Sequence, residues 1–182
     1  MKPPPERLEA LVELARRARR GGRADLEELL RQSAGFVHAV ARGRLGNSLA
    51  AEGAAVDALA RAARALPRLK DVQSYPAWLY RIAVRCAADA RSRSGAVDIG
   101  PLDPVDPAAG PADVLVAVER SRTVRDAVTA LPTRQRDVVL LHFVEGLSYR
   151  EIACVQGIAL GTVARRMKRA LGALKQALGG VQ

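Results

Sequence analysis

Apolar residues recur three and four positions apart along most of this chain, a spacing that predicts amphipathic helices. The pattern is sharpest near the carboxyl end. Counting from Val163, one narrow apolar stripe holds Val163, Met167, Ala170, Leu171, Leu174 and Leu178. The hydroxyl and cations on the opposite side and its flanks are Thr162, Arg165, Arg166, Lys168 and Arg169. The pattern therefore predicts a helix with an apolar inner seam and a basic outer face.

A second helix is predicted directly before this one. Ser148 and Glu151 have the spacing of a capping box, in which each side chain accepts a hydrogen bond from the other residue's backbone N–H. Gly157 supplies the left-handed residue that ends a helix after Gln156. Two helices with a short link, the second basic outside and apolar inside, predict a helix-turn-helix. The alternative is a small bundle with a solvated basic face, but three independent local signals in register favour the helix-turn-helix.

Four more helices are predicted upstream in the first half of the chain. An amphipathic helix ends at Gly21-Gly22, and a second runs from an N-cap at Asp25 to about Leu45. A third runs from Leu49 to Leu66, with Val56, Leu59 and Ala63 on its inner side, and a fourth from Tyr75 to Arg93, with Trp78, Leu79, Ile82 and Cys86 as its apolar stripe.

In the second half, Pro132 separates a helix over 119–130 from one whose inner face would be Val138, Val139, Leu141 and Val144. No alternating β pattern is present, so an all-α protein is expected.

The charge pattern divides the chain into two basic parts. Residues 1–93 carry a net charge of +8 and residues 133–182 a net charge of +5, whereas residues 94–118 contain no Lys or Arg and four Asp. Four Pro and three Gly in that stretch indicate a flexible acidic linker. The predicted organisation is an accessory helix over 1–22, a helical domain over 23–93, the linker over 94–118 and a helix-turn-helix domain over 119–182.

Composition narrows the function to binding rather than catalysis. The net charge of +10 points to a polyanionic partner. His38 and His142 lie far apart without a catalytic constellation, and Cys86 and Cys154 lack metal-ligand spacing and are expected to be reduced core thiols. No enzyme activity, cofactor or metal site is therefore expected. The absence of a long apolar run and of a signal-peptide core predicts a cytoplasmic protein without a membrane span.

Several short motifs resemble region 4 of bacterial sigma-70-family sigma factors, with the extracytoplasmic-function (ECF) subgroup nearest. They are Leu131-Pro132, Arg134-Gln135-Arg136, Glu145-Gly146-Leu147-Ser148-Tyr149, Glu151-Ile152-Ala153 and Gly161-Thr162-Val163. The resemblance implies that Thr162, Arg165, Arg166, Lys168 and Arg169 read the minus-35 element of promoter DNA. It also implies that Ser148, Tyr149 and Arg150 position the DNA backbone.

The first module is similar to region 2 of the same family. The similarity rests on the segment from Trp78 to Ala83 with Asp89, and on an ungapped alignment of the helix over 49–66 with the family's polymerase-docking helix. It implies polymerase contacts by Glu52, Asp57, Arg61 and Arg64. Ala50, Gly53, Val56, Ala63 and Arg85 depart from the usual family residues, which marks a diverged member.

Unpaired bases stack on aromatic rings, and cations follow the strand's backbone. The predicted fourth helix carries both aromatic rings and cations, namely Tyr75, Trp78, Tyr80, Arg81 and Arg85. The resemblance implies that this helix contacts and opens the minus-10 element. In the alternative reading, Trp78 is simply the largest core residue of a helical bundle. Tyr75 and Tyr80 are expected to be the exposed rings.

The implied function is that of a sigma factor, a dissociable subunit that binds core RNA polymerase and directs it to promoter DNA. An anti-sigma factor is a further partner that the resemblance leaves open. One alternative is a sigma-derived DNA-binding regulator that does not open promoters. Another is a protein-interaction module whose basic faces bind an acidic partner.

Overall fold

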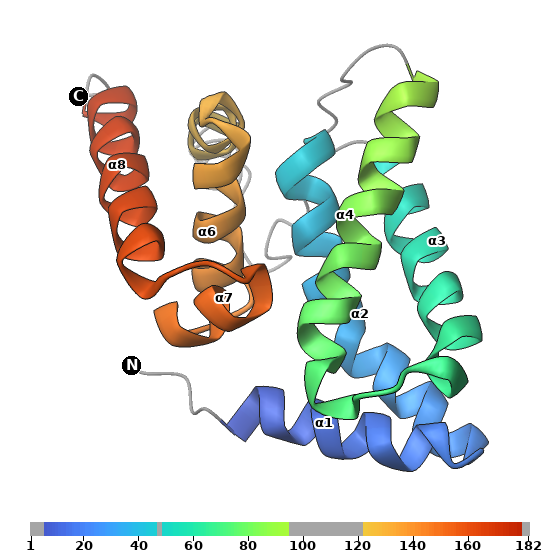
Figure 1. Ribbon diagram of the computed structural model, residues 1–182. Coiled ribbons are helices and arrows are strands. Elements are labelled where there is room, and N and C mark those ends of the chain that lie inside the picture. The colour runs from blue at the N-terminus through green and yellow to red at the C-terminus, as the bar shows by residue number, and fades with distance from the viewer. Residues whose placement is uncertain (1–5, 47–48, 95–121, 180–182) are drawn as a thin grey trace, which may run out of the picture.

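The regular elements are all helical in the part of the chain that the computed structural model describes, residues 6–46, 49–94 and 122–179 (Figure 1). The longer helices are α1 (Glu6–Arg19), α2 (Arg23–Leu45), α3 (Leu49–Ala65), α4 (Tyr75–Ser94), α6 (Thr133–Phe143), α7 (Tyr149–Gln156) and α8 (Leu160–Leu178). Two short 3-10 turns, Leu66–Arg68 and Val72–Ser74, join α3 to α4, and residues 122–130 are helical. The all-α prediction is confirmed. The expected linker over 94–118 lies almost entirely outside the described residues.

Helices α2, α3 and α4 form a bundle, and α1 crosses its base (Figure 1). The face of α3 that enters the core consists of alanines, namely Ala51, Ala54, Ala55, Ala58 and Ala62. The expected inner position of Val56 is wrong, because its side chain is 63% exposed. An alanine-rich helix gives a weak apolar period, and the small side chains face the neighbouring helices while the larger valine points outward.

Helix α1 belongs to the same core as this bundle. Leu11, Leu14 and Ala15 are buried, and α1 packs against α2 and α4. At its end, Arg19 Nη1 donates a hydrogen bond to the Leu69 carbonyl at 2.7 Å, which ties α1 to the connection between α3 and α4. The predicted N-cap of α2 at Asp25 is wrong, since α2 begins at Arg23 with Gly22 as its cap residue.

The helix-turn-helix forms as predicted. Ser148 caps α7 and the full capping box with Glu151 is present. Gly157 is left-handed, with φ of 66° and ψ of 39°, and its N–H returns to carbonyls of the last turn of α7. Helix α8 then starts after Ala159, whose side chain makes no cap hydrogen bond. Local residue chemistry is sufficient to set these boundaries.

Three expected core positions in the second half are exposed instead. Leu171 is 43% exposed because it lies at the edge of the α8 stripe, about 80° from Val163 at 100° per residue. Val144 is 63% exposed because it follows the last residue of α6. Cys154 is also exposed, whereas Cys86 is buried as expected.

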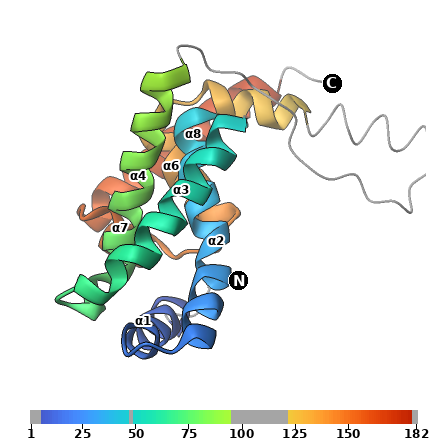
Figure 2. The ribbon, with the colours of Figure 1, turned by 90° about the vertical axis from the view of Figure 1, so that its right-hand side faces the viewer.

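The two modules pack directly against each other. Helix α6 lies against α2 and α7 lies against α4, and buried residues of both modules form one continuous apolar cluster. In a view turned by 90°, α6, α7 and α8 lie behind the first bundle (Figure 2). This packing brings side chains more than 50 residues apart in sequence into one polar network.

Candidate nucleic-acid and polymerase interface

Helix α8 presents cations on the side opposite its buried seam. Val163, Met167 and Ala170 are fully buried, and the exposed cations are Arg165, Lys168 and Arg169. Thr162 is half-buried at the start of the helix. The predicted opposition of an apolar and a basic face is therefore present.

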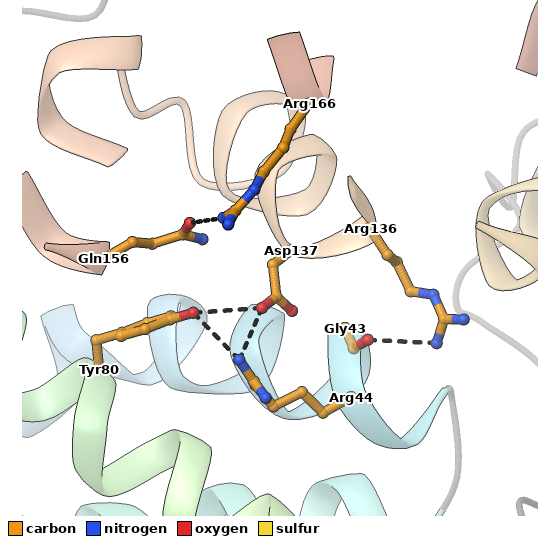
Figure 3. A network of polar contacts seen from close by, with 7 residues as sticks. All are labelled: Gly43, Arg44, Tyr80, Arg136, Asp137, Gln156 and Arg166. Carbon is orange, nitrogen blue, oxygen red and sulfur yellow. Dashed lines mark hydrogen bonds and ion pairs between the residues drawn. The ribbon is translucent and has the colours of Figure 1, made fainter. Parts of the chain in front are cut away.

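Arg166 lies differently from the other α8 cations. Its side chain is half-buried, and its Nη1 donates a hydrogen bond to Gln156 Oε1 of α7 at 3.0 Å (Figure 3). Arg166 thus links the two helices of the helix-turn-helix.

The three residues at the start of α7 that are expected to position the DNA backbone have different surroundings. Ser148 Oγ accepts from the Glu151 N–H at 3.3 Å, and the Ser148 N–H donates to Glu151 Oε2 at 2.7 Å. Tyr149 packs its ring edge-on against His142, with centroids 5.1 Å apart. Arg150 is exposed. Of the three residues expected to meet the DNA backbone, only Arg150 therefore offers an exposed charge.

Tyr75 is not an exposed ring, and that expectation is wrong. Its side chain is 1% exposed and its hydroxyl lies 3.0 Å from Ser33 Oγ in the core of the bundle. Burial raises the pKa of Tyr75 to about 12. Tyr75 is the first residue of α4, and its ring packs against Trp78, with centroids 5.9 Å apart, while its hydroxyl reaches Ser33 of α2.

Trp78 of α4 is half-buried. Together with Ile82 it lines a shallow hollow that Arg61, Ala65 and Arg85 complete. Arg81 and Arg85 are exposed. Helix α4 therefore carries the indole of Trp78 and the exposed guanidinium groups of Arg81 and Arg85.

Tyr80 is half-buried and lies between the modules. Its hydroxyl donates to Asp137 Oδ2 at 3.2 Å and accepts from Arg44 Nη2 at 3.2 Å (Figure 3). Arg44 Nη2 also donates to the same carboxylate oxygen at 2.9 Å. The expected exposure of Tyr80 is wrong in this packing, because residues of α2 and α6 occupy its polar end.

Asp137 is the centre of this network and is only 3% exposed. Burial raises the pKa of Asp137, and the nearby charges and hydrogen bond of Arg44, Tyr80, Arg136 and Arg166 counter that effect only in part. Its second oxygen, Oδ1, is buried without a hydrogen-bond partner among the described residues, a situation that costs about 1–3 kcal/mol. The ion pair therefore orients the modules more than it stabilises them.

A chain of ion pairs joins the outer sides of α3 and α4. Arg61 Nη2 lies 2.8 Å from Asp57 Oδ2, and Arg61 Nη1 donates to Asp89 Oδ2 at 3.0 Å. These hydrogen bonds, the one to Asp57 first, raise the pKa of Arg61. Of the four predicted polymerase contacts, Asp57 and Arg61 are thus engaged with each other, whereas Glu52 and Arg64 are exposed.

Two exposed apolar residues on α3 were not predicted as site residues. Leu49 is almost fully exposed, and Val56 follows it seven residues later on the same helical face. Glu52 lies between them on that face. The spacing was visible in the sequence, but the alanine-rich pattern placed Val56 in the core.

Among the described residues, no group of His, Cys, Asp and Glu side chains could hold a metal ion. Within the same residues, no helix is long and apolar enough to cross a membrane.

Comparisons with known proteins identify both modules. The family described as "Sigma-70 region 2" matches residues 29–96, and "Sigma-70, region 4" matches residues 121–174. The chain is 32% identical over 159 residues to the ECF RNA polymerase sigma factor SigM of Mycobacterium tuberculosis, covering 87% of this chain and 80% of SigM. It is 31% identical over 179 residues to SigD of the same species, covering 93% and 83%.

A solved structure supports the fold. The CnrH chain, determined in complex with the cytosolic domain of CnrY, superposes with a TM-score of 0.68 at 22% identity, over 94% of this chain and 98% of that one. The two matched regions, in the order in which this chain carries them, together with the identity to SigM and SigD over most of its length, show that the chain belongs to the ECF group of sigma-70-family sigma factors.

Proposed function

We propose that this chain is a dissociable sigma subunit that binds core RNA polymerase and directs promoter-specific initiation of transcription. The observation that carries the proposal is α8, whose exposed Arg165, Lys168 and Arg169 stand opposite a fully buried seam in a chain of this family. A helix with cations on one face and buried apolar residues on the other can lie in the major groove while its apolar face stays in the protein core. As a polymerase subunit the chain would act in the cytoplasm.

The upstream contact is assigned to the helix-turn-helix. Arg165 and Arg169 offer planar guanidinium forks for base edges, and Lys168 offers a point charge for phosphates. Thr162 and Arg166 lie at the margins of this face. Arg150 at the start of α7 would hold the DNA backbone, while Ser148 and Tyr149 set the orientation of α7 through the cap and the ring contact.

The downstream contact is assigned to α4. Trp78 and Tyr80 would stack unpaired bases of the minus-10 element, and Arg81 and Arg85 would follow the strand's phosphates. Tyr75 has no direct part in this proposal because its ring is buried. It supports the site through its packing against Trp78.

Polymerase docking is assigned to the outer face of α3. Leu49 and Val56 expose apolar surface that a partner could cover, and Glu52 and Arg64 add charge beside it. Asp57 and Arg61 would act mainly by pinning α3 to α4 through Asp89. An anti-sigma factor that holds the chain inactive is a further proposed partner.

Strand opening separates this proposal from a regulator that only binds duplex DNA. We expect Tyr80→Ala to impair promoter opening by the reconstituted holoenzyme, because a stacking platform is worth about 1–3 kcal/mol per base, while duplex binding by α8 survives. Permanganate reactivity of thymines in the promoter bubble measures the opening. Unchanged reactivity in the variant would contradict the role assigned to Tyr80.

A further inference from the structure

Exposed cations gather where the end of α1 meets the connection between α3 and α4. Arg19 and Arg20 come from the end of α1 and Arg68 and Lys70 from the connection, and these four residues are called the basic corner. Arg19 Nη1 donates hydrogen bonds to the Leu69 carbonyl at 2.7 Å and to the Lys70 carbonyl at 3.4 Å. The connection passes along α1 at the base of the bundle (Figure 1). Cations from two segments distant in sequence therefore share one site.

The charges of the basic corner are not neutralised within the described part of the chain. None of its four cations forms an ion pair with a carboxylate there. Asp71, the acidic residue next to Lys70, accepts a hydrogen bond from the Gln73 N–H at 3.0 Å. The helix dipole favours cations in the last turn of α1, but it does not account for Arg68 and Lys70. Like charges gathered without a carboxylate favour a polyanionic partner.

The basic corner begins close to the hollow beside Trp78. Ala65 lines that hollow, and Arg68 follows it in the short 3-10 turn Leu66–Arg68. Between Ala65 and Lys70 the fully extended chain could span at most about 17 Å. A nucleic-acid strand carries one phosphate per roughly 3.4 Å of helix axis, so this length corresponds to about five nucleotides. A strand with one base stacked on Trp78 could therefore reach the basic corner within a few nucleotides.

We propose that the basic corner binds phosphates of the unpaired promoter strand, so that α1 extends the strand contact of α4. This contact presupposes the proposed role of α4 in holding that strand. It gives α1 a direct part in DNA binding, in addition to its packing in the core.

Arg19 is prepared for this role by its two carbonyl contacts. They fix its guanidinium before DNA arrives, which reduces the side-chain entropy lost on binding. Its Nε and Nη2 groups remain as donors for a phosphate. Because phosphate contacts carry no base information, the basic corner adds affinity without adding sequence preference.

Binding of thymidine oligonucleotides to the full chain tests the basic corner. Trp78 is the only tryptophan of the chain, so quenching of its fluorescence reports a base at the α4 site. At roughly 3.4 Å per phosphate, an oligonucleotide of about 12 nucleotides would reach the basic corner and one of about 3 would not. Arg20→Gln should weaken binding of the longer oligonucleotide about fivefold at about 0.1 M salt, since each single-strand phosphate contact contributes a slope of about −0.7. Binding of the shorter one should not change.

The salt dependence identifies the lost contact as one to a phosphate. For the longer oligonucleotide, Arg20→Gln and Lys70→Gln should each reduce the slope of log K against log salt concentration by about 0.7. Arg20→Lys keeps the charge and should keep the slope. Arg134→Gln is the matched control, because Arg134 is an exposed arginine on α6 of the other module. Equal affinities and slopes in the parent, Arg20→Gln and Lys70→Gln would overturn the proposal.

Photo-crosslinking in the promoter complex shows what the basic corner contacts there. The crosslinking residue p-benzoylphenylalanine replaces Arg20 in the full chain, which is then reconstituted with core RNA polymerase on promoter DNA. We expect crosslinks to the unpaired strand beside the minus-10 element, and none to that strand when Arg134 is replaced instead. Crosslinks from position 20 to a polymerase subunit alone would mean that the basic corner binds protein, and the proposal would fail.

Two readouts separate the basic corner from the function on which it rests. Fluorescence anisotropy of a labelled long oligonucleotide measures binding anywhere on the chain, whereas quenching of Trp78 reports only the α4 site. Binding that depends on Arg20 without any quenching would contradict the role of α4 and support the strand contact of the basic corner. Quenching that is the same in all variants would support α4 and overturn the basic corner. If the holoenzyme never opened a promoter, the proposed function would fail, and the titrations would still decide whether Arg20 binds a strand.

Discussion

Asp137 shows how one buried carboxyl can couple the packing of two modules to proton concentration. Burial raises its pKa above the ordinary value of 3.8, so the packed modules bind a proton more readily than separated modules would. By linkage, the resulting stabilisation of the packing between the modules is fully present below the ordinary pKa and is lost as the pH rises through the raised pKa. The groups that face this carboxyl are Arg44, Tyr80, Arg136 and Arg166.

We therefore expect the chain to become more compact as the pH falls from neutral toward the ordinary range of an Asp carboxyl. Scattering measurements across this range give the radius of gyration directly. Asp137→Asn removes the titrating group and should remove the pH response. A response of the same size in the Asn variant would assign it to another group.

Helices α8 and α7 are expected to contact different parts of the DNA: Arg165 of α8 the base edges, and Arg150 of α7 the backbone. Arg165→Ala should change base preference in a panel of minus-35 variants, because a bidentate guanidinium contact is worth about 1–3 kcal/mol of discrimination. Arg150→Ala should weaken binding almost evenly across the panel, since phosphate contacts carry no base information. Identical preferences in Arg165→Ala and the parent would mean that α8 is oriented differently from the proposal.

Among the elements, α8 lacks the cap that α7 possesses. Ala159 has the extended backbone of an N-cap residue but no side-chain acceptor for the first turn. Ala159→Ser should raise the free energy of unfolding by about 1 kcal/mol, as measured by urea denaturation. Ser148→Ala, which removes the existing cap of α7, is the matched opposite and should lower it by a similar amount. Equal stability of Ala159→Ser and the parent would show that the first turn of α8 is satisfied in another way.

The elements also show which features the sequence could predict. The capping box, the left-handed Gly157 and the two faces of α8 depend on residues within a few positions of each other, and they were predicted correctly. The inner face of α3 was not, because its core residues are alanines and the period was assigned to Val56 instead. Tyr75 was misplaced for another reason: what buries it includes Ser33, 42 residues earlier in the chain.

For the whole molecule, the sequence predicted two modules but not their contact. Arg44 and Asp137 lie 93 residues apart, and neither residue's local pattern indicates the other. Gly35, Ala39 and Gly43 of α2 are spaced four residues apart and share one face, and these small residues were the available signal for a closely packed neighbour. It could not have identified α6 as that neighbour, because any helix could fill such a stripe.

The number of residues between the described parts of the two modules sets how far apart the modules could reach. Residues 95–121 could span up to about 90 Å if fully extended, similar to the separation of the two promoter elements. Two weak binding sites joined by one linker gain affinity, because binding at one site raises the effective concentration of the other. A linked pair of weak sites can therefore give a specific promoter complex.

The central claim is that this chain gives core RNA polymerase a promoter preference, and reconstitution tests it most directly. The full chain is mixed with core polymerase and genomic DNA fragments, and the run-off transcripts are sequenced. We expect start sites to share upstream elements near minus 35 and minus 10, and to disappear when Arg165, Lys168 and Arg169 are all changed to Ala. Transcripts that match those of core polymerase alone, with no shared upstream element, would contradict the account.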